Sequence, residues 1–108
     1  MNKKQSAIDR ILEAVLECCN VDAEGAVAIT AEMVRGKDRH DNVLMTRCIF
    51  VSIMVLMGYS RTTTAAYLGR NEKSIGNILA QANQYRATSK AYLWADAEAV
   101  LKVKRLDI

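Results

Sequence analysis

The absence of proline is the feature that most constrains this chain. None of its 108 residues is proline, and only five are glycine. Proline breaks a helix interior and glycine weakens it, so little in the sequence interrupts long helices except where a turn is needed. Hydrophobic residues make up 51% of the chain, which is enough to build one modest core. We therefore expect a single all-α domain over residues 1–108, with five to six helices in a compact bundle.

Helical periodicity is clearest near the N-terminus. Hydrophobic residues between Ile8 and Cys19 recur three or four positions apart, with charged residues between them. This spacing predicts an amphipathic helix, for which Ser6 is the expected cap. Residues 20–22 should end that helix, and a weaker second helix is expected to run to about Val34.

The most apolar segment follows a charged connector, residues 35–42. Asp41 and Asn42 are good N-caps, and the run from Val43 to Met57 is apolar nearly all round. This pattern predicts a central helix packed on several sides, although the β-branched residues would also permit a strand. We favour the helix because the run is about fifteen residues long and no neighbouring strand pattern exists to pair with it.

A short helix bounded by glycines is predicted next. Gly58 should end the central helix, and Ser60 or Thr62 should begin a helix that stops at Gly69. Ala65 is small enough to let a second helix cross closely, and glycine accepts the positive φ of a tight turn.

The helix after Gly69 is expected to run from its cap, Asn71, to Gln84. Its inward stripe would be Ile75, Ile78, Leu79 and Ala82, and its outward face Lys73, Asn77, Gln81 and Gln84. Two helices joined in this way form a helix-turn-helix, whose second helix enters the major groove of DNA. The spacing therefore points first to double-stranded DNA as the ligand.

A last helix is predicted from residues 88–89 onward. Its expected inward residues are Leu93, Ala97, Val100 and Leu101. Tyr92 and Trp94 are expected in the core or at an interface, rather than as a platform for stacked bases.

Charge is concentrated in the middle of the chain. Residues 35–90 hold nine Lys or Arg against three Asp or Glu, whereas residues 1–34 hold three against six and residues 91–108 are balanced. A net charge of +6 in the segment that carries the helix-turn-helix is typical of a surface that neutralises phosphates. A solvated basic face would give the same pattern.

Little in the sequence favours an enzyme, a cofactor or a metal site. Cys18, Cys19 and Cys48 form no C-x-x-C pair, so neither a disulfide framework nor a zinc site is favoured, and a reducing cytoplasm suits them. His40 is the only histidine, which leaves a catalytic dyad without partners. The longest nearly apolar segment, residues 48–57, is about half the length that a membrane-spanning helix needs. We expect a soluble, cytoplasmic protein that does not associate with membranes.

The order of these features resembles a known family. Residues 20–22, the basic connector, Thr46 and Arg47 on the central helix, Ser60, and residues 69–75 resemble the C-terminal DNA-binding domain of the bacterial replication initiator DnaA over nearly the whole chain. The resemblance implies a Trp-repressor-like fold, binding to double-stranded DNA at short origin boxes and a role in DNA replication. The initiator's ATPase module needs a Gly-rich loop ending in Gly-Lys-Ser/Thr, which does not occur here, so we expect a free-standing DNA-binding domain.

The turn both keeps and departs from the family pattern, which reads roughly Gly-Arg-Asp-His-Ser/Thr-Thr-Val. Gly69, Arg70, Ser74 and Ile75 keep it, whereas Asn71, Glu72 and Lys73 replace residues at positions that face bases in the family. Glu72 would repel phosphate unless it accepts a hydrogen bond from a cytosine amino group, or it could stabilise the first turn of the helix.

Twelve residues are the candidates for DNA contact. Arg70 suits a phosphate or a guanine edge. It lies at the N-terminal end of the helix after Gly69, from which Asn71, Lys73, Ser74 and Asn77 could also reach bases or phosphates. Arg47 matches the family's central-helix arginine, but it could instead pair with a buried carboxylate. Capping alone would explain Ser60 and Thr62 almost as well. The full set is Lys37, Arg39, Arg47, Ser60, Arg61, Thr62, Thr63, Arg70, Asn71, Lys73, Ser74 and Asn77.

Two other functions stay open. The same fold could be a helical protein–protein interaction module that has lost its DNA contacts and docks a protein partner through its acidic N-terminal helix or the Tyr92 and Trp94 region. Glu72 is the residue that most favours this alternative. Within the DNA-binding class, the chain could be the helical domain of a transposase or a repressor.

Overall fold

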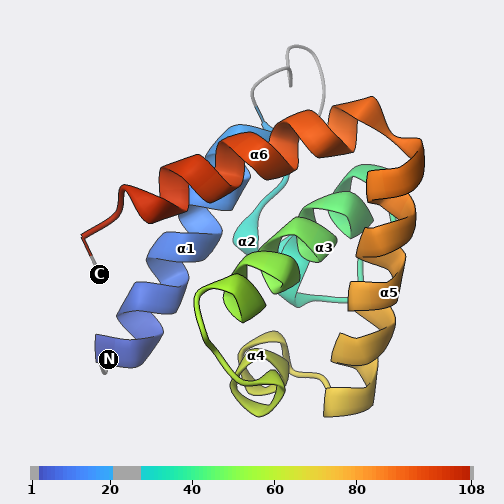
Figure 1. Cartoon of the computed structure of the whole chain (residues 1–108). Helices are drawn as coiled ribbons and strands as arrows, with labels where there is room; N and C mark the ends of the chain where they lie inside the picture. Colours follow the sequence, from blue (N-terminus) through green and yellow to red (C-terminus); the bar gives the residue numbers. More distant parts are fainter. Residues whose placement is uncertain (1–2, 21–27, 108) are drawn as a thin grey trace.

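Helices make up all of the regular secondary structure in residues 3–20 and 28–107, the part that this computed structural model describes. The helices pack into one bundle (Figure 1). They are α1 (Lys3–Cys19), α2 (Ala31–Arg35), α3 (Asp41–Leu56), α4 (Arg61–Leu68), α5 (Glu72–Thr88) and α6 (Lys90–Lys104). The expected all-α bundle is confirmed. No described helix combines the length and apolar character needed to cross a bilayer.

Helix α3 lies at the centre of the bundle and packs against each of the other five helices. Its core side chains, among them Phe50, Ile53 and Met54, are almost completely buried. An apolar helix with no solvated side can be accommodated only in such a position. The predicted central helix is confirmed, and the strand alternative is wrong. Asp41 and Asn42 do not occupy the N-cap position as expected, because the helix already begins at Asp41 and His40 is its N-cap.

Helices α1 and α2 differ at their ends from the predictions. Helix α1 buries most of its predicted stripe, with Leu16 and Cys19 half-buried, but it begins at Lys3, so Ser6 lies inside the helix and is not its cap. Helix α2 is a single short segment capped by the Thr30 hydroxyl, and residues 28–30 are not helical. The Asn20 side chain exchanges two hydrogen bonds, 3.0 and 2.9 Å long, with the backbone of Ile29, which fixes these residues outside a helix. Residues 21–27 of the predicted weak helix lie outside the described residues.

Helices α4 and α5 form the predicted helix-turn-helix pair. The Ser60 hydroxyl caps α4, and Gly69 ends it in the left-handed conformation with φ of 65°. A residue with a Cβ would be strained at this φ, so the glycine allows the chain to turn within three residues. The Asn71 side chain accepts a hydrogen bond from the Ser74 amide and caps α5, as expected. Helix α5 continues one turn beyond Gln84, to Thr88.

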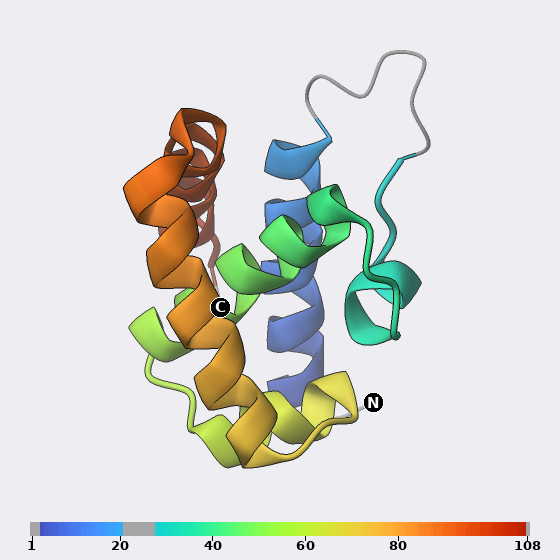
Figure 2. The same ribbon diagram turned by 90° about the vertical axis from the view of Figure 1, so that its right-hand side faces the viewer.

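Helix α5 lies on the outside of the bundle and packs against α3, α4 and α6 (Figure 2). Of its predicted inward stripe, Ile75 and Ala82 are buried, and Ile78 and Leu79 are half-buried. Lys73, Asn77 and Gln84 are exposed on the outward side.

The predicted inward face of α6 is wrong. The buried residues are Tyr92, Ala99 and Val103, whereas Leu93 and Leu101 are about half exposed. The ring of Tyr92 stacks on that of Tyr85 in α5, with 5.2 Å between centroids. This aromatic contact at the bend between α5 and α6 sets the rotation of α6 and turns its leucines toward solvent. Ala97 is likewise exposed and Val100 half-buried; Trp94 is half exposed.

Candidate nucleic-acid interface

The candidate residues occupy two adjoining parts of one side of the molecule. Figure 2 shows α5 on the left, the connector between α2 and α3 on the right, and α4 at the bottom. A cleft of about 640 Å³ separates the connector from α5, with α3 as its floor. Half of the twelve candidates line it: Lys37, Arg39, Arg47, Arg70, Ser74 and Asn77.

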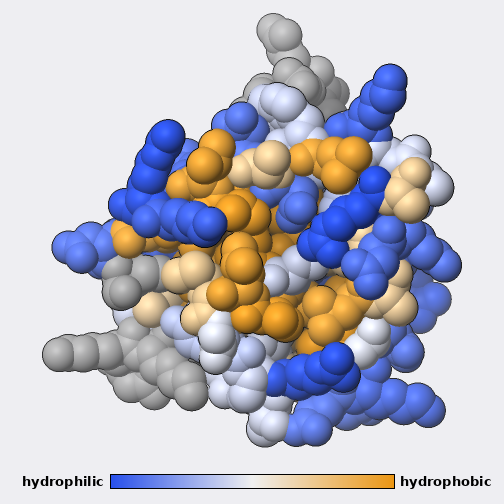
Figure 3. Space-filling model, viewed as in Figure 1, coloured by the Kyte–Doolittle hydropathy of each residue, from blue (hydrophilic) through white to orange (hydrophobic). Residues whose placement is uncertain are grey.

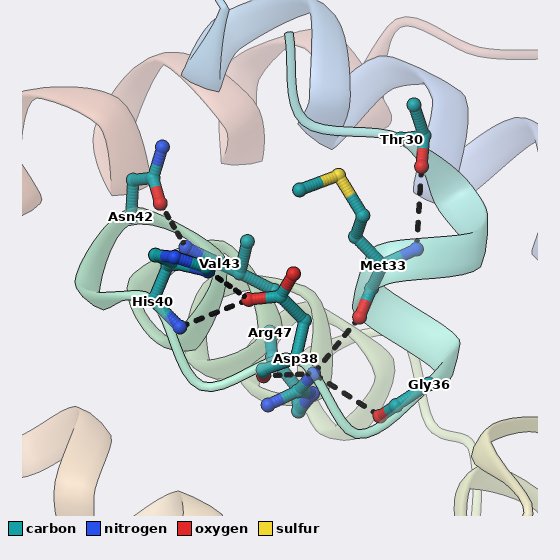
Figure 4. A network of polar contacts seen from close by, with 8 residues as sticks. All are labelled: Thr30, Met33, Gly36, Asp38, His40, Asn42, Val43 and Arg47. Atoms are coloured by element: carbon teal, nitrogen blue, oxygen red, sulfur yellow. Dashed lines mark hydrogen bonds and ion pairs between the residues drawn. The ribbon is translucent and has the colours of Figure 1, made fainter. Parts of the chain in front are cut away.

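Arg47 is buried at the base of this cleft and holds the connector. Its side chain is 4% exposed, and its Nε donates to the carbonyl of Val34 at 2.8 Å. Its Nη2 donates to the carbonyls of Met33, Gly36 and Asp38 at 3.0, 3.2 and 3.1 Å (Figure 4). Carbonyls at the end of a helix lack partners within the helix, and a cation there also complements the helix dipole.

Arg47 therefore caps the C-terminus of α2. This structural role corrects the expectation that it contacts DNA directly, and its partners are carbonyls rather than the buried carboxylate considered as the alternative. Burial lowers the pKa of Arg47, and the nearby charge of Arg70 adds to that shift.

Arg70 ties the connector to the turn of the helix-turn-helix. It is half-buried, and its guanidinium donates to the carbonyls of Leu68 and Gly36. The carbonyl of Gly36 thus accepts hydrogen bonds from both Arg47 and Arg70. Burial lowers the pKa of Arg70. The alternative of a freely solvated turn residue does not describe Arg70.

Gly36 is needed for this arrangement. A Cβ at this position would lie 2.8 Å from the carbonyl oxygen of Glu32, which is closer than real Cβ contacts allow. The chain can therefore leave α2 along this path only with glycine at position 36. Gly36 was not among the twelve candidates, and the sequence signal for its structural role was a glycine directly after a predicted helix and before a basic run.

Asp38 does not line the cleft, although its charge acts on Arg47 from nearby. Its carboxylate accepts hydrogen bonds from the backbone amide and the Nδ1 of His40, at 2.9 and 2.7 Å. These hydrogen bonds lower the pKa of Asp38. Four cationic side chains therefore line the cleft, and no carboxylate among the described residues does.

The α4 end of the interface is organised by caps. Ser60 accepts from the amide of Thr63 and donates to its hydroxyl, so both candidates serve the start of α4. Thr62 donates to the Glu72 carboxylate instead of capping α4. Glu72 is thereby drawn toward α4. The Ser74 hydroxyl donates to the Asn71 side chain at 3.0 Å.

Arg61, Lys73 and Asn77 are the exposed candidates nearest the outer edge of α5. Arg61 reaches across from α4, and a Cβ added at Gly76 would lie 3.4 Å from its Nη1. The glycine lets this guanidinium lie close to the α5 backbone. Lys37 and Arg39 are exposed on the other side of the cleft.

Within the described part of the chain, no group of three His, Cys, Asp or Glu side chains could hold a metal ion. Comparison of the chain with protein-family models, with curated proteins and with solved structures finds no significant match.

Proposed function

We propose that this protein binds double-stranded DNA through its helix-turn-helix, with α5 as the recognition helix. The observation that carries the proposal is the position of α5. Its exposed N-terminal half, with Lys73 and Asn77, lies between Arg61 on one side and the cationic connector on the other. A polar helix flanked by cations matches the way in which recognition helices read base edges while neighbouring groups hold the phosphates.

Lys73 and Asn77 are the groups proposed for base contact. Lysine suits the acceptors of guanine in the major groove, and asparagine suits adenine. Lys37, Arg39 and Arg61 are proposed to contact phosphates on either side. The engagement of Glu72 with Thr62 supports this arrangement, because it holds the carboxylate at the α4 side of the motif.

The resemblance to the DnaA domain adds to the proposal. It implies a Trp-repressor-like arrangement and a replication role, which we propose for this chain together with a non-enzymatic function in the cytoplasm. The three cysteines are all free thiols, which agrees with a reducing compartment.

The test is duplex binding across a range of salt concentrations. With a labelled random duplex and fluorescence anisotropy, we expect the logarithm of the affinity to fall with log salt by about 0.9 per phosphate contacted. A flat response would overturn the proposal. Selection of bound sequences from a random duplex pool would then define the target, and Asn77→Ala should change that selection whereas Lys104→Gln, an exposed change on α6, should not.

A protein-interaction module is the second candidate, because apolar side chains gather on another face. Figure 3 shows them across the centre of the view, over α6 and the C-terminal end of α3. The exposed large ones are Val55, Leu56, Met57, Leu93, Trp94 and Leu101. This face suits a protein partner better than α1 does, because Glu17 and Asp9 of α1 already bind Lys102 and Tyr67. A partner recovered by pull-down in the absence of duplex binding would favour this function.

A further inference from the structure

Four cationic side chains line the cleft beside α5, and no carboxylate in the described part of the chain does. Lys37, Arg39, Arg47 and Arg70 line it, and two of these guanidinium groups share one carbonyl acceptor. Like charges held together in a partly buried site are unfavourable unless an anion compensates them. Arginine is the residue whose planar group best matches the paired oxygens of a phosphate.

The cleft also has room and lining for more than a phosphate. Its volume of about 640 Å³ lies within the range of small-molecule sites. Leu44 and Ile78 give it an apolar wall, and Asn77 and Gln81 of α5 add side-chain amides. An apolar surface beside amides suits the face and the edge of a nucleobase.

We propose that this cleft binds a nucleoside phosphate, with its phosphate at Arg39 and Arg70 and its base between Ile78 and the amides of Asn77 and Gln81. Arg47 acts as a positioning residue, since its side chain is almost completely buried and already binds four backbone carbonyls, whereas Arg70 is only half-buried. This inference deepens the proposed function and rests on it in one respect. Asn77 would contact both the nucleotide and duplex DNA, so the two ligands should compete for the protein.

The first experiment uses the full chain, labelled with ¹⁵N, and adenosine 5′-monophosphate as the probe. Amide signals of Gly36, Ser74 and Asn77 should shift, and adenosine without phosphate should bind about tenfold more weakly, as expected for the loss of charge-assisted hydrogen bonds. Absence of these shifts at millimolar nucleotide, or equal binding of adenosine, would overturn the inference.

Two matched variants separate the cleft from exposed positive charge elsewhere on the protein. Arg39→Gln should weaken nucleotide binding about tenfold, because its exposed side chain lines the cleft. Lys104→Gln removes an exposed charge on α6 that does not line the cleft, and should leave nucleotide binding unchanged. Equal losses in the two variants would mean that the nucleotide responds only to general charge, which contradicts a built site.

The third experiment identifies the source of the nucleoside phosphate. Nucleotide is added to the complex with labelled duplex. Two results together would show that a DNA strand supplies the nucleoside phosphate. The added nucleotide should release the bound duplex, and duplex alone should shift the same amide signals of the cleft residues as the nucleotide does. Simultaneous binding would assign the cleft to a free nucleotide and contradict the competition. If duplex does not bind at all while the cleft shifts with nucleotide persist, the proposed DNA-binding function fails and the nucleotide site stands.

Discussion

One face of this protein has a paired exposed cation, whereas the exposed cations of another face are all unpaired among the described residues. On the face formed by α1 and α6, Lys102 pairs with Glu17, and Arg10 donates to the carbonyl of Asp107 at 3.0 Å. On the basic face, defined by Lys37, Arg39, Arg61 and Lys73, no carboxylate among the described residues lies within ion-pair distance. Exposed ion pairs contribute little to the free energy of folding. The main effect of the pair between Lys102 and Glu17 is therefore to neutralise the charge of Lys102.

The two faces differ in their apolar surface as well. Helix α6 presents Leu93, Trp94 and Leu101 to solvent, whereas the outer side of α5 is polar. Figure 3 shows this contrast between the apolar centre and the more hydrophilic right-hand edge, where α5 lies. An unpaired positive charge on a polar surface favours an anionic ligand, and an exposed apolar surface favours a protein.

Arg47→Met should have the largest effect, because Arg47 supports the basic face from below. The substitution leaves carbonyls of α2 and the connector without partners, and we expect the free energy of unfolding to fall by about 3 kcal/mol. Urea denaturation followed by circular dichroism measures it. Arg39→Met, which removes an exposed arginine, is the matched control and should leave the midpoint in place. Equal midpoints for the two variants would show that Arg47 is not structural.

The double variant Lys37→Gln/Arg39→Gln tests whether the unpaired charges bind DNA. If each contacts one phosphate, duplex affinity near physiological salt should fall about thirtyfold, and the salt slope should decrease by about 1.8. The matched variant Lys104→Gln/Arg105→Gln removes the same charge from two exposed residues at the α6 end. If both double variants lost a similar amount of duplex affinity, the basic face would bind DNA no better than the α6 end does.

Gly36→Ala and Gly76→Ala should change stability in opposite directions. A methyl group at Gly36 meets the Glu32 carbonyl, so the connector must shift, and we expect a loss of about 1–2 kcal/mol. Gly76 lies within a helix and faces only the end of the Arg61 side chain, so alanine there should stabilise the fold by about 1 kcal/mol. Thermal unfolding of both variants gives the comparison. A gain for Gly36→Ala would contradict the steric requirement.

The smallest expected effect concerns Trp94, which is the only tryptophan and lies on α6. Duplex bound at α5 should leave its emission maximum unchanged, since its half-exposed ring stays in the same surroundings. A clear blue shift on addition of duplex would show that the α6 face also takes part in binding.

The structure could be predicted from the sequence where it depends on residues that are close together in the chain. The ends of α4 and the start of α5 follow from Ser60, Gly69 and Asn71, whose caps and turn act within a few positions. Helix α3 followed from its length and apolar character. These local signals located the helix-turn-helix and most of the exposed candidates.

The structure could not be predicted from the sequence where it depends on contacts between residues that are far apart in the chain. The rotation of α6 depends on the stacking of Tyr92 on Tyr85, which local periodicity does not encode. The role of Arg47 depends on carbonyls 9 to 14 positions away, and on the exact residue at which α2 ends. The cleft could not be predicted either, since it exists only because the path of the chain at Gly36 brings the connector beside α5.

The carbonyl shared by Arg47 and Arg70 has one further consequence. It is a main-chain oxygen, so the separation of the connector from α5 does not depend on the side chains that follow Gly36. Lys37 and Arg39 can therefore be exchanged for other residues without moving the frame that carries them. If the proposed phosphate contacts exist, the strength of binding could be tuned at these two exposed positions while the hydrogen bonds that hold the connector stay in place.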